Sequence, residues 1–334
     1  MFRKVVLLML GLAVALSACG SSTRSPEPVE GSTNEAVPLI KIRLPMGYIP
    51  NIQYAPFYVA VEKGYFKEAG IEIEFDYKFE TDGVALVGAG ELPFAVVSGE
   101  QVLLARAKGL PVTYVAAWYQ QYPVSVVAKS DAGVLVPQDL KGKKIGLPGL
   151  FGANYIGLRA LLNAGELTEA DVTLEAIGFN QVELMTAGQQ DIIVGYAANE
   201  PIQLKAQGIA VTELRVADYA QLAANGILAS EKVIKENPEL VRGFVSAFLK
   251  GLNDTIKDPD EAFQLSETHI PNFSELDAAV QKQVLATSVE QWKAERPGYS
   301  DPAAWDNMQA VLLDMGLLTE QQDLSKAFTN EFVP

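Results

Sequence analysis

Short runs of strand-like pattern alternate with longer runs of helical periodicity along most of the chain. Residues 41–45 and 71–75 alternate polar and apolar side chains, as half-buried strands do. The first block of predicted strands is 41–45, 71–75, 94–97 and 112–118, and its predicted helices are 56–69, 82–87 and 101–108. Strands separated by helices at this spacing predict βαβ units and a mainly parallel sheet.

The same alternation restarts after the Tyr/Gln/Pro segment 119–123. The predicted strands of this second block are 125–128, 144–147, 174–177, 191–196 and 209–214, with 226–229 as its return strand; its predicted helices are 154–163, 182–187 and 201–206. From residue 231 the chain is nearly all helical, with Phe244, Phe248, Trp292 and Trp305 on apolar faces. This helical part is expected to pack back on the first block.

These patterns predict an α/β protein of two lobes. The first lobe comprises residues 40–123 plus 229–334, and the second comprises 124–228. Two chain crossings, near residues 123 and 228, would form a hinge with a cleft between the lobes. Ligands of open α/β sheets bind at the carboxyl ends of the strands, so the cleft is the expected binding site.

The first 18 residues have the composition of a bacterial export signal. Arg3 and Lys4 precede a 12-residue apolar run, 5–16, which is shorter than the about 20 residues that span a bilayer. The sequence Leu16-Ser17-Ala18-Cys19-Gly20 resembles a lipobox, which predicts lipidation of Cys19; an ordinary cleavage site beside a chance cysteine is the alternative. Residues 19–39 are rich in Ser, Pro, Glu and Gly and are expected to form a flexible tether. The protein is therefore expected outside the cytoplasm, anchored to the cell membrane by an N-terminal lipid.

Composition excludes several classes of function. The net charge is −15, or −17 without Arg3 and Lys4, which disfavours nucleic acid as a partner. One His (His269) and one Cys rule out zinc fingers, Cys/His nucleophilic pairs and an internal disulfide. Neither G-x-G-x-x-G nor a P-loop is present, and neither a metal nor a cofactor is predicted.

Several segments together resemble the type II periplasmic binding proteins. They are Gly47-Tyr48-Ile49-Pro50-Asn51, residues 56–66, residues 88–98, residues 106–112 and residues 139–146. The similar branch contains thiamine-pyrimidine synthase and the nitrate-, taurine-, sulfonate- and thiamine-precursor-binding proteins. The resemblance covers about residues 40–250 and implies a monomeric receptor that delivers a small ligand to the permease and ATPase subunits of an ABC importer. Closure of the lobes would bury the ligand.

The turn expected to bind an anion in this family is 147–155, and here it contains no Ser or Thr. The candidate cleft positions are aromatic instead: Tyr48, Tyr54, Trp118, Tyr119, Tyr122, Phe151, Tyr155 and Tyr196. Aromatic faces stack on planar rings, although some of these side chains could belong to the core or the hinge.

Three polar residues complete the predicted ligand site. Asn199 and Glu200 follow the strand 191–196, and Asn51 follows Pro50 in the first βα turn. Glu200 could accept hydrogen bonds from ring N–H or hydroxyl groups, or could simply be a carboxylate favoured in the first turn of a helix. Asn51 could bond an amide-like edge or could serve only to form the turn.

Asn51 and Glu200 match the thiamine-precursor branch, in which Trp and His are common at the positions of Tyr48 and Tyr54. The preferred ligand is therefore a flat heterocyclic vitamin, riboflavin, with a thiamine pyrimidine precursor as the alternative and a sulfonate- or nitrate-type anion as a lesser one. An enzyme is disfavoured, because the synthases of this branch resemble catalysts that need an active-site His and a Cys-rich iron site. A lipoprotein that binds another protein through an acidic face is a further alternative.

Overall fold

The computed structural model describes residues 38–334. The predicted signal peptide, Cys19 and the tether up to residue 37 lie outside the described residues. Within 38–334, no helix combines the length and apolar character required to cross a bilayer. Residues 38–334 form one compact unit.

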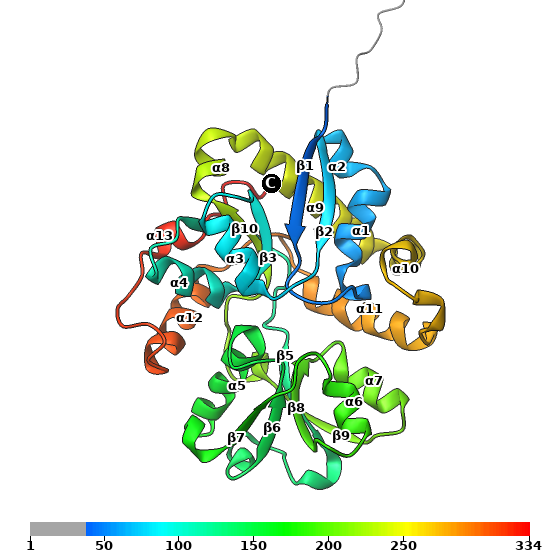
Figure 1. The fold of residues 1–334 in the computed structure, drawn as a ribbon, viewed down its shortest axis with the longest axis vertical. Helices are drawn as coiled ribbons and strands as arrows, with labels where there is room; N and C mark the ends of the chain where they lie inside the picture. Colours follow the sequence, from blue (N-terminus) through cyan, green and yellow to red (C-terminus); the bar gives the residue numbers. More distant parts are fainter. Residues whose placement is uncertain (1–37) are drawn as a thin grey trace, which may run out of the picture. The chain divides into compact units, whose positions relative to one another are not determined.

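The first group of strands comes from two parts of the sequence, residues 40–117 and 226–230, on either side of the second group. Strands β1 (Ile40–Pro45) and β2 (Ile71–Asp76) pair in parallel. Strands β3 (Phe94–Val97), β10 (Gly226–Ser230) and β4 (Val112–Ala117) form a sheet in the order β3-β10-β4, and β1 lies beside β3. These strands lie in the upper part of Figure 1.

The second group is a five-stranded sheet of the order β7-β6-β8-β5-β9 in the lower part of Figure 1. Its strands are β5 (Val124–Lys129), β6 (Lys144–Leu147), β7 (Thr173–Ala176), β8 (Ile192–Tyr196) and β9 (Val211–Arg215). The predicted strands of both blocks are thus present to within two or three residues.

One strand in each group runs against its neighbours. β10 is antiparallel to β3 and β4, and β5 is antiparallel to β8 and β9. Each is the first strand after the chain has crossed between the groups. A chain that crosses at the carboxyl ends of one set of strands enters the next sheet from that same edge, so its first strand must point the other way.

This geometry corrects one boundary predicted from the sequence. Residues 226–229 were expected to end the second lobe, which was placed at 124–228. They pair instead with β3 and β4, so the chain has crossed back before Gly226, between the end of β9 and Asn225. A short strand of buried apolar residues carries no sign of the sheet to which it belongs, which explains the error.

Helices flank both groups of strands (Figure 1). They are α1 (Ala55–Glu62), α2 (Tyr65–Glu68), α3 (Glu80–Gly88), α4 (Gly99–Ala107), α5 (Gly152–Ala164), α6 (Gln181–Thr186), α7 (Glu200–Ala206), α8 (Glu231–Glu236), α9 (Pro238–Lys257), α10 (Pro259–Ser266), α11 (Ala278–Trp292), α12 (Pro302–Asp314) and α13 (Leu324–Ala327). The helix predicted over 56–69 is two helices, because Gly64 adopts a φ of +76°, which ends α1 and precedes α2.

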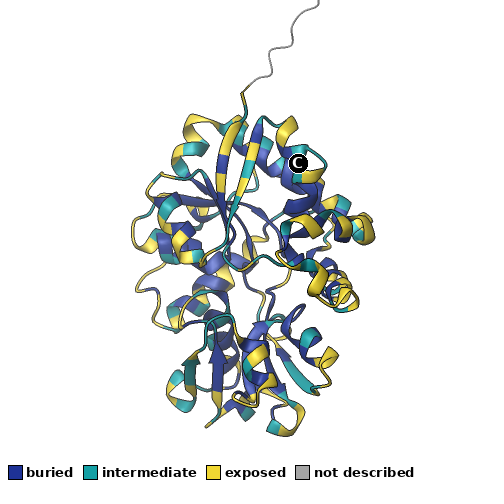
Figure 2. Ribbon diagram, turned by 45° about the vertical axis from the view of Figure 1, so that its right-hand side comes forward, coloured by how far each residue is buried: buried dark blue, intermediate teal, exposed yellow. Residues whose placement is uncertain are grey.

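The C-terminal helices pack on the first group of strands and helices, as predicted. α9 contacts α1 and α2, α12 contacts α4, and α13 contacts β4. The rings of Phe94 in β3 and Phe244 in α9 stack with centroids 4.2 Å apart. Phe244, Phe248, Trp292 and Trp305 are fully buried, which confirms their predicted placement on apolar faces. Figure 2 shows that the central strands are buried, that β1 and β2 carry exposed and half-buried residues, and that the exposed residues of the helices lie on their outer faces.

Candidate functional site

A cavity of about 810 Å³, part of it open to solvent, lies at the carboxyl ends of the strands. Its walls come from the segments that follow β1, β2 and β4 and from those that follow β6, β7 and β8. The lining residues are Met46, Gly47, Tyr48, Gln53, Tyr54, Phe79, Glu80, Thr81, Trp118, Tyr119, Pro148, Phe151, Gly152, Ala153, Asn154, Phe179, Gln181, Tyr196, Asn199, Glu200 and Asn225. Both groups of strands therefore contribute to one site of the size that a small organic ligand needs.

Eight of the eleven residues predicted for a ligand site line this cavity. They are Tyr48, Tyr54, Trp118, Tyr119, Phe151, Tyr196, Asn199 and Glu200. They come from four segments that are distant in sequence. The remaining three, Asn51, Tyr122 and Tyr155, do not line it.

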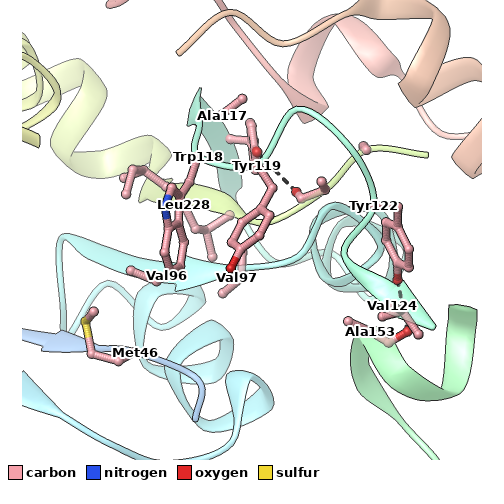
Figure 3. Close-up of a cluster of buried hydrophobic side chains, with 14 of the residues drawn as sticks. Met46, Val96, Val97, Ala117, Trp118, Tyr119, Tyr122, Val124, Ala153 and Leu228 are labelled. Atoms are coloured by element: carbon pink, nitrogen blue, oxygen red, sulfur yellow. Dashed lines mark hydrogen bonds between the residues drawn. The ribbon is translucent and has the colours of Figure 1, made fainter. Parts of the chain in front are cut away.

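Tyr122 and Tyr155 bond to other parts of the protein. The Tyr122 hydroxyl lies 3.2 Å from Glu100 Oε2 and 3.1 Å from the Ala153 carbonyl oxygen, and the latter contact is visible in Figure 3. The Tyr155 hydroxyl donates to Glu169 at 2.6 Å. Both rings project from segments that also carry lining residues, so sequence position alone could not exclude them.

Asn51 has the local role of a helix cap. Its Oδ1 accepts a hydrogen bond of 2.9 Å from the backbone N–H of Gln53, at the start of the 3₁₀ helix η1 (Ile52–Tyr54). This is the turn-forming role that the sequence left open. Asn51 also lines a second cavity, described below.

One wall of the cavity is a cluster of rings from the first group. Trp118 and Tyr54 stack with centroids 5.5 Å apart at 30°. The Tyr54 hydroxyl donates to the Met46 carbonyl oxygen at 2.7 Å, which fixes the ring. Tyr119 follows Trp118, and Figure 3 shows both at the end of the segment that continues from Ala117. These contacts hold flat faces in place before any ligand arrives.

The opposing rings include two that the sequence analysis missed, Phe79 and Phe179. Phe79 lies 5.2 Å from Phe151 and 5.1 Å from Phe179, and Tyr48 lies 4.7 Å from Phe179, all between ring centroids. Phe79 follows β2 and Phe179 follows β7. Inspection of the carboxyl end of every predicted strand, rather than of a few, would have found both.

Glu200, the first residue of α7, is only 4% exposed. Its Oε2 accepts a hydrogen bond of 2.7 Å from the Tyr196 backbone N–H. Burial raises the pKa of this carboxyl to about 7, against the opposing effect of that hydrogen bond. A Cβ at Gly195 would lie 2.6 Å from Glu200 Oε2, so glycine at this point of β8 leaves the space that the carboxyl occupies.

Glu80, at the start of α3, is a second acid of the cavity, and sequence reasoning missed it. Its Oε2 accepts from the Ser98 backbone N–H at 3.1 Å, and its Oε1 accepts from Asn225 Nδ2 at 3.2 Å. Burial and the neighbouring Glu100 raise the pKa of Glu80 to about 8. A helix-start glutamate without an apolar neighbour pattern gives no sequence signal for such burial.

Two lining residues carry buried polar atoms without a hydrogen-bond partner among the described residues: Trp118 Nε1 and Asn154 Oδ1. A buried donor or acceptor left unpaired is costly, so a side-chain shift that brings either atom to a polar ligand group or water would be favourable. No Lys, Arg or His lines the cavity. Residues 38–334 also contain no group of three or more His, Cys, Asp or Glu that could hold a metal ion.

A second cavity of about 600 Å³ adjoins the first and shares Tyr48, Phe179, Gln181, Asn199 and Glu200 with it. Its other polar lining residues are Asn51, Glu183, Gln203 and Gln281. The aromatic cavity thus adjoins a space that offers amide and carboxyl groups.

An aromatic cavity at the strand ends of two α/β lobes, with two chain crossings, defines a ligand-binding protein of the periplasmic type. Solved structures agree with this fold. The alkanesulfonate-binding protein SsuA of Xanthomonas axonopodis pv. citri, bound to MOPS, is 17% identical with a TM-score of 0.69 over 87% of this chain and 98% of that one.

The chain belongs to the NMT1/THI5-like family, whose model matches residues 51–262. It is 44% identical to the riboflavin-binding protein RibY of Chloroflexus aurantiacus, over 98% of this chain and 96% of that one. It is 27% identical to the formylaminopyrimidine-binding protein of Halalkalibacterium halodurans, over 91% of each chain. It is also 24% identical to the 4-amino-5-hydroxymethyl-2-methylpyrimidine phosphate synthase of Legionella pneumophila, over 88% of this chain and 92% of that one.

Proposed function

We propose that this protein is the substrate-binding component of an ABC importer and that it captures riboflavin in the aromatic cavity. The observation that carries the proposal is an aromatic cavity without a cationic side chain, in a chain 44% identical to a riboflavin-binding protein over nearly its whole length. A flat, uncharged ring system is the ligand that such walls accommodate best.

In this proposal the tricyclic ring lies among Trp118, Tyr54 and the opposing phenylalanines. The free Trp118 Nε1–H would donate to a ring carbonyl or ring nitrogen, and Glu200 with Asn199 would meet the polar edge of the ring. The hydroxylated ribityl tail would extend into the second cavity, where Asn51, Gln203 and Gln281 offer both donors and acceptors.

The test is a titration of riboflavin with the protein that lacks residues 1–19. Quenching of the flavin fluorescence measures binding. Saturable quenching at micromolar concentration or below is expected, since stacked aromatic rings quench a bound flavin. Trp118→Ala should weaken binding at least tenfold. Tyr155→Phe is the matched control, because this aromatic side chain lies in α5 outside the cavity and should leave the affinity unchanged. Absence of riboflavin binding would overturn the proposal.

A thiamine pyrimidine precursor is the second candidate. Glu200 and Asn199 at the cavity wall favour it, since a carboxyl and an amide suit an aminopyrimidine edge, and a formylaminopyrimidine-binding protein is a relative. Calorimetric titration with formylaminopyrimidine separates the two ligands: tighter binding of the pyrimidine than of riboflavin would replace the first candidate. An anion has less support, because neither a cation nor a Ser or Thr lines the cavity beside the start of α5.

The residues of the cavity favour binding over catalysis. His269, the only histidine, stacks on Tyr58 with centroids 4.6 Å apart and bonds to Glu62 at 2.7 Å, away from the lining residues. The cavity therefore holds no imidazole to act as a general base. Recovery of riboflavin unchanged after prolonged incubation is the expected result.

Delivery to a permease and ATPase, and attachment through a lipid on Cys19, complete the proposal. Metabolic labelling with a palmitate analogue should mark the wild-type protein, and Cys19→Ala should abolish the label and release the protein from the membrane fraction. A labelled Cys19→Ala variant would contradict lipidation at this residue. The isolated protein is expected to sediment as a monomer.

A further inference from the structure

One acid of the cavity wall and one behind it lie on either side of Ser98. Glu80 lines the cavity, and Glu100 in α4 is fully buried behind it. Neither is among the carboxylates that pair with a basic side chain within residues 38–334. A buried carboxylate without a cation is strongly disfavoured, so the location of protons in this pair decides its stability.

A chain of hydrogen bonds connects these acids to the second lobe. Ser98 Oγ lies 2.5 Å from Glu80 Oε2 and also bonds to Glu100 Oε1. The other oxygen of Glu100, Oε2, lies 3.2 Å from the Tyr122 hydroxyl, which lies 3.1 Å from the carbonyl oxygen of Ala153 in α5. Figure 3 shows Tyr122 pointing at Ala153. Four contacts thus run from the cavity wall to the first turn of α5.

Each of these four contacts needs one proton to be a hydrogen bond. The hydroxyls of Ser98 and Tyr122 supply one each, and a carbonyl oxygen can only accept. The two remaining protons must come from Glu80 and Glu100. The four hydrogen bonds then all run in one direction. Glu80 donates to Ser98, Ser98 to Glu100, Glu100 to Tyr122 and Tyr122 to Ala153. If both acids were ionised, two contacts would set oxygen lone pairs against each other.

We propose that Glu80 and Glu100 both carry a proton when the cleft is closed, and that Glu80 is a specificity-determining residue that presents an uncharged carboxyl to a neutral ligand. With both acids protonated, the series of hydrogen bonds joins the wall of the cavity to α5 of the second lobe. Loss of its protons would place negative charge beside the ligand and break a contact that spans the two lobes. The choice of riboflavin as the probe rests on the proposed function.

No basic side chain among residues 38–334 pairs with these two acids. The partial positive charge beside them comes from the starts of α3 and α4, where Glu80 and Glu100 lie in the first turn, and from the Ser98 N–H. Glu80 is near the phenols of Tyr54, Tyr122 and Tyr196 and the amide of Asn225. Glu100 is near Gln101, whose Nε2 donates at 3.3 Å, and the phenol of Tyr114. Burial raises the pKa of each of these phenols further, so they remain neutral while the acids titrate.

The sign of the pH dependence follows from these surroundings. Burial and Glu100 raise the pKa of Glu80 to about 8, and burial also raises the pKa of Glu100. An acid whose pKa is raised is protonated at neutral pH and loses its proton as the pH increases. The contribution of this pair to ligand affinity should therefore be constant below about pH 7 and fall above about pH 8. Burial raises the pKa of Glu200, in the same cavity, to about 7, so the effect of the pair is the difference between the wild-type profile and that of Glu80→Gln/Glu100→Gln.

The first experiment measures riboflavin affinity by fluorescence quenching from about pH 6 to about pH 9. The dissociation constant of the wild type should rise by up to about tenfold per pH unit above pH 8, as expected for release of one proton. Glu80→Gln/Glu100→Gln should abolish this rise. Glu80→Ala should bind more weakly than Glu80→Gln at neutral pH, because the amide still donates to Ser98. Glu91→Gln, an exposed acid beyond the end of α3, is the control and should keep the wild-type profile. A flat wild-type profile, or a rise that persists in the double variant, would overturn the proposal.

The second experiment needs no ligand. Infrared absorption at neutral pH should contain the carbonyl stretch of a protonated carboxylic acid, and Glu80→Gln should reduce this band. If riboflavin does not bind at any pH while Glu80→Gln removes part of the band, the proposed function fails and the protonated pair stands. If riboflavin binds with a flat pH profile and the band is absent, the pair fails and the proposed function stands.

Discussion

At the scale of single residues, a missing side chain makes room for a functional one. Gly195 lies in β8, one residue before Tyr196, whose N–H binds Glu200. A Cβ on Gly195 would lie 2.6 Å from both the carboxyl carbon and Oε2 of Glu200, which is closer than real contacts allow. The position of the Glu200 carboxyl therefore depends on a glycine five residues before it in the sequence.

Gly195→Ala is expected to displace the Glu200 carboxyl from the cavity wall. Riboflavin affinity should fall by roughly 10- to 100-fold, which corresponds to about 1–3 kcal/mol for one lost or misplaced buried hydrogen bond. Fluorescence titration measures the loss, and thermal unfolding verifies that the variant is folded. An affinity equal to that of the wild type in folded Gly195→Ala would mean that Glu200 does not meet the ligand.

Glu200→Ala should weaken riboflavin binding by a similar amount. Glu200→Gln distinguishes two possible roles of this carboxyl, a hydrogen-bond acceptor and an anion. Burial raises the pKa of this carboxyl to about 7, so the charged and neutral forms are both present near neutral pH. If the ligand needs an acceptor, Glu200→Gln retains most of the affinity through its amide oxygen. If it needs the anion, Glu200→Gln is as weak as Glu200→Ala, and the wild-type affinity increases as the pH rises through 7. Calorimetry across this range measures both.

At the scale of elements, the packing of α9 against α1 stabilises the lobe that carries most of the aromatic cavity wall. α9 crosses α1 so closely that a Cβ on Gly251 would lie 2.1 Å from the Pro56 carbonyl oxygen and 2.9 Å from the Ala60 N. Since backbone atoms cannot rotate away as a side chain can, the two helices would have to separate. α1 directly follows η1, which contains Tyr54 and Gln53 of the cavity.

Gly251→Ala should therefore lower the free energy of unfolding by about 1–3 kcal/mol, the range measured for overpacked interiors. Denaturant titration gives the value. Gly251 lies outside both cavities, so the number of riboflavin molecules bound per chain should stay at one. A stability equal to that of the wild type would show that α1 and α9 can move apart without cost.

The elements also show what periodicity cannot predict. Strands β1 and β2 were found from alternation, because they are half-exposed, and the fully buried β3, β4 and β10 were found as short apolar runs between polar turns. The break between α1 and α2 at Gly64 and the sheet membership of β10 were not predicted. A glycine inside a helical pattern is compatible with both a continuous and a broken helix, and pairing between strands depends on chain segments over a hundred residues apart.

At the scale of the whole molecule, the charge around the cleft selects the ligand. The two cavities hold Glu80, Glu183 and Glu200 and no basic side chain. A phosphate ester placed there would lose its hydration without gaining a cation or a favourable counter-charge. The cleft should thus discriminate between a vitamin and its phosphorylated form.

Flavin mononucleotide is accordingly expected to bind at least about 100-fold more weakly than riboflavin, a difference of about 2.7 kcal/mol. Competition titration against bound riboflavin measures the ratio. Thermal unfolding gives an independent result: riboflavin at 100 times its dissociation constant should stabilise the protein by about 2.7 kcal/mol, and flavin mononucleotide at the same concentration should have little effect. Equal affinities would mean that the tail of the ligand projects out of the cleft into solvent.

The sequence by itself determined the α/β class, the order of strands and helices, the burial of the C-terminal aromatic residues and most of the aromatic cavity wall. These properties follow from local periodicity and from the rule that ligand-binding side chains lie at the carboxyl ends of strands. It could not separate Tyr122 and Tyr155 from the rings that line the cavity, because the side of a turn on which a ring lies depends on packing. Only the tertiary structure decided that Glu80 joins the site and that Glu80 and Glu100 lie on either side of Ser98. Burial and shared protons depend on groups that are distant in sequence, and the distances between such groups exist only in the folded chain.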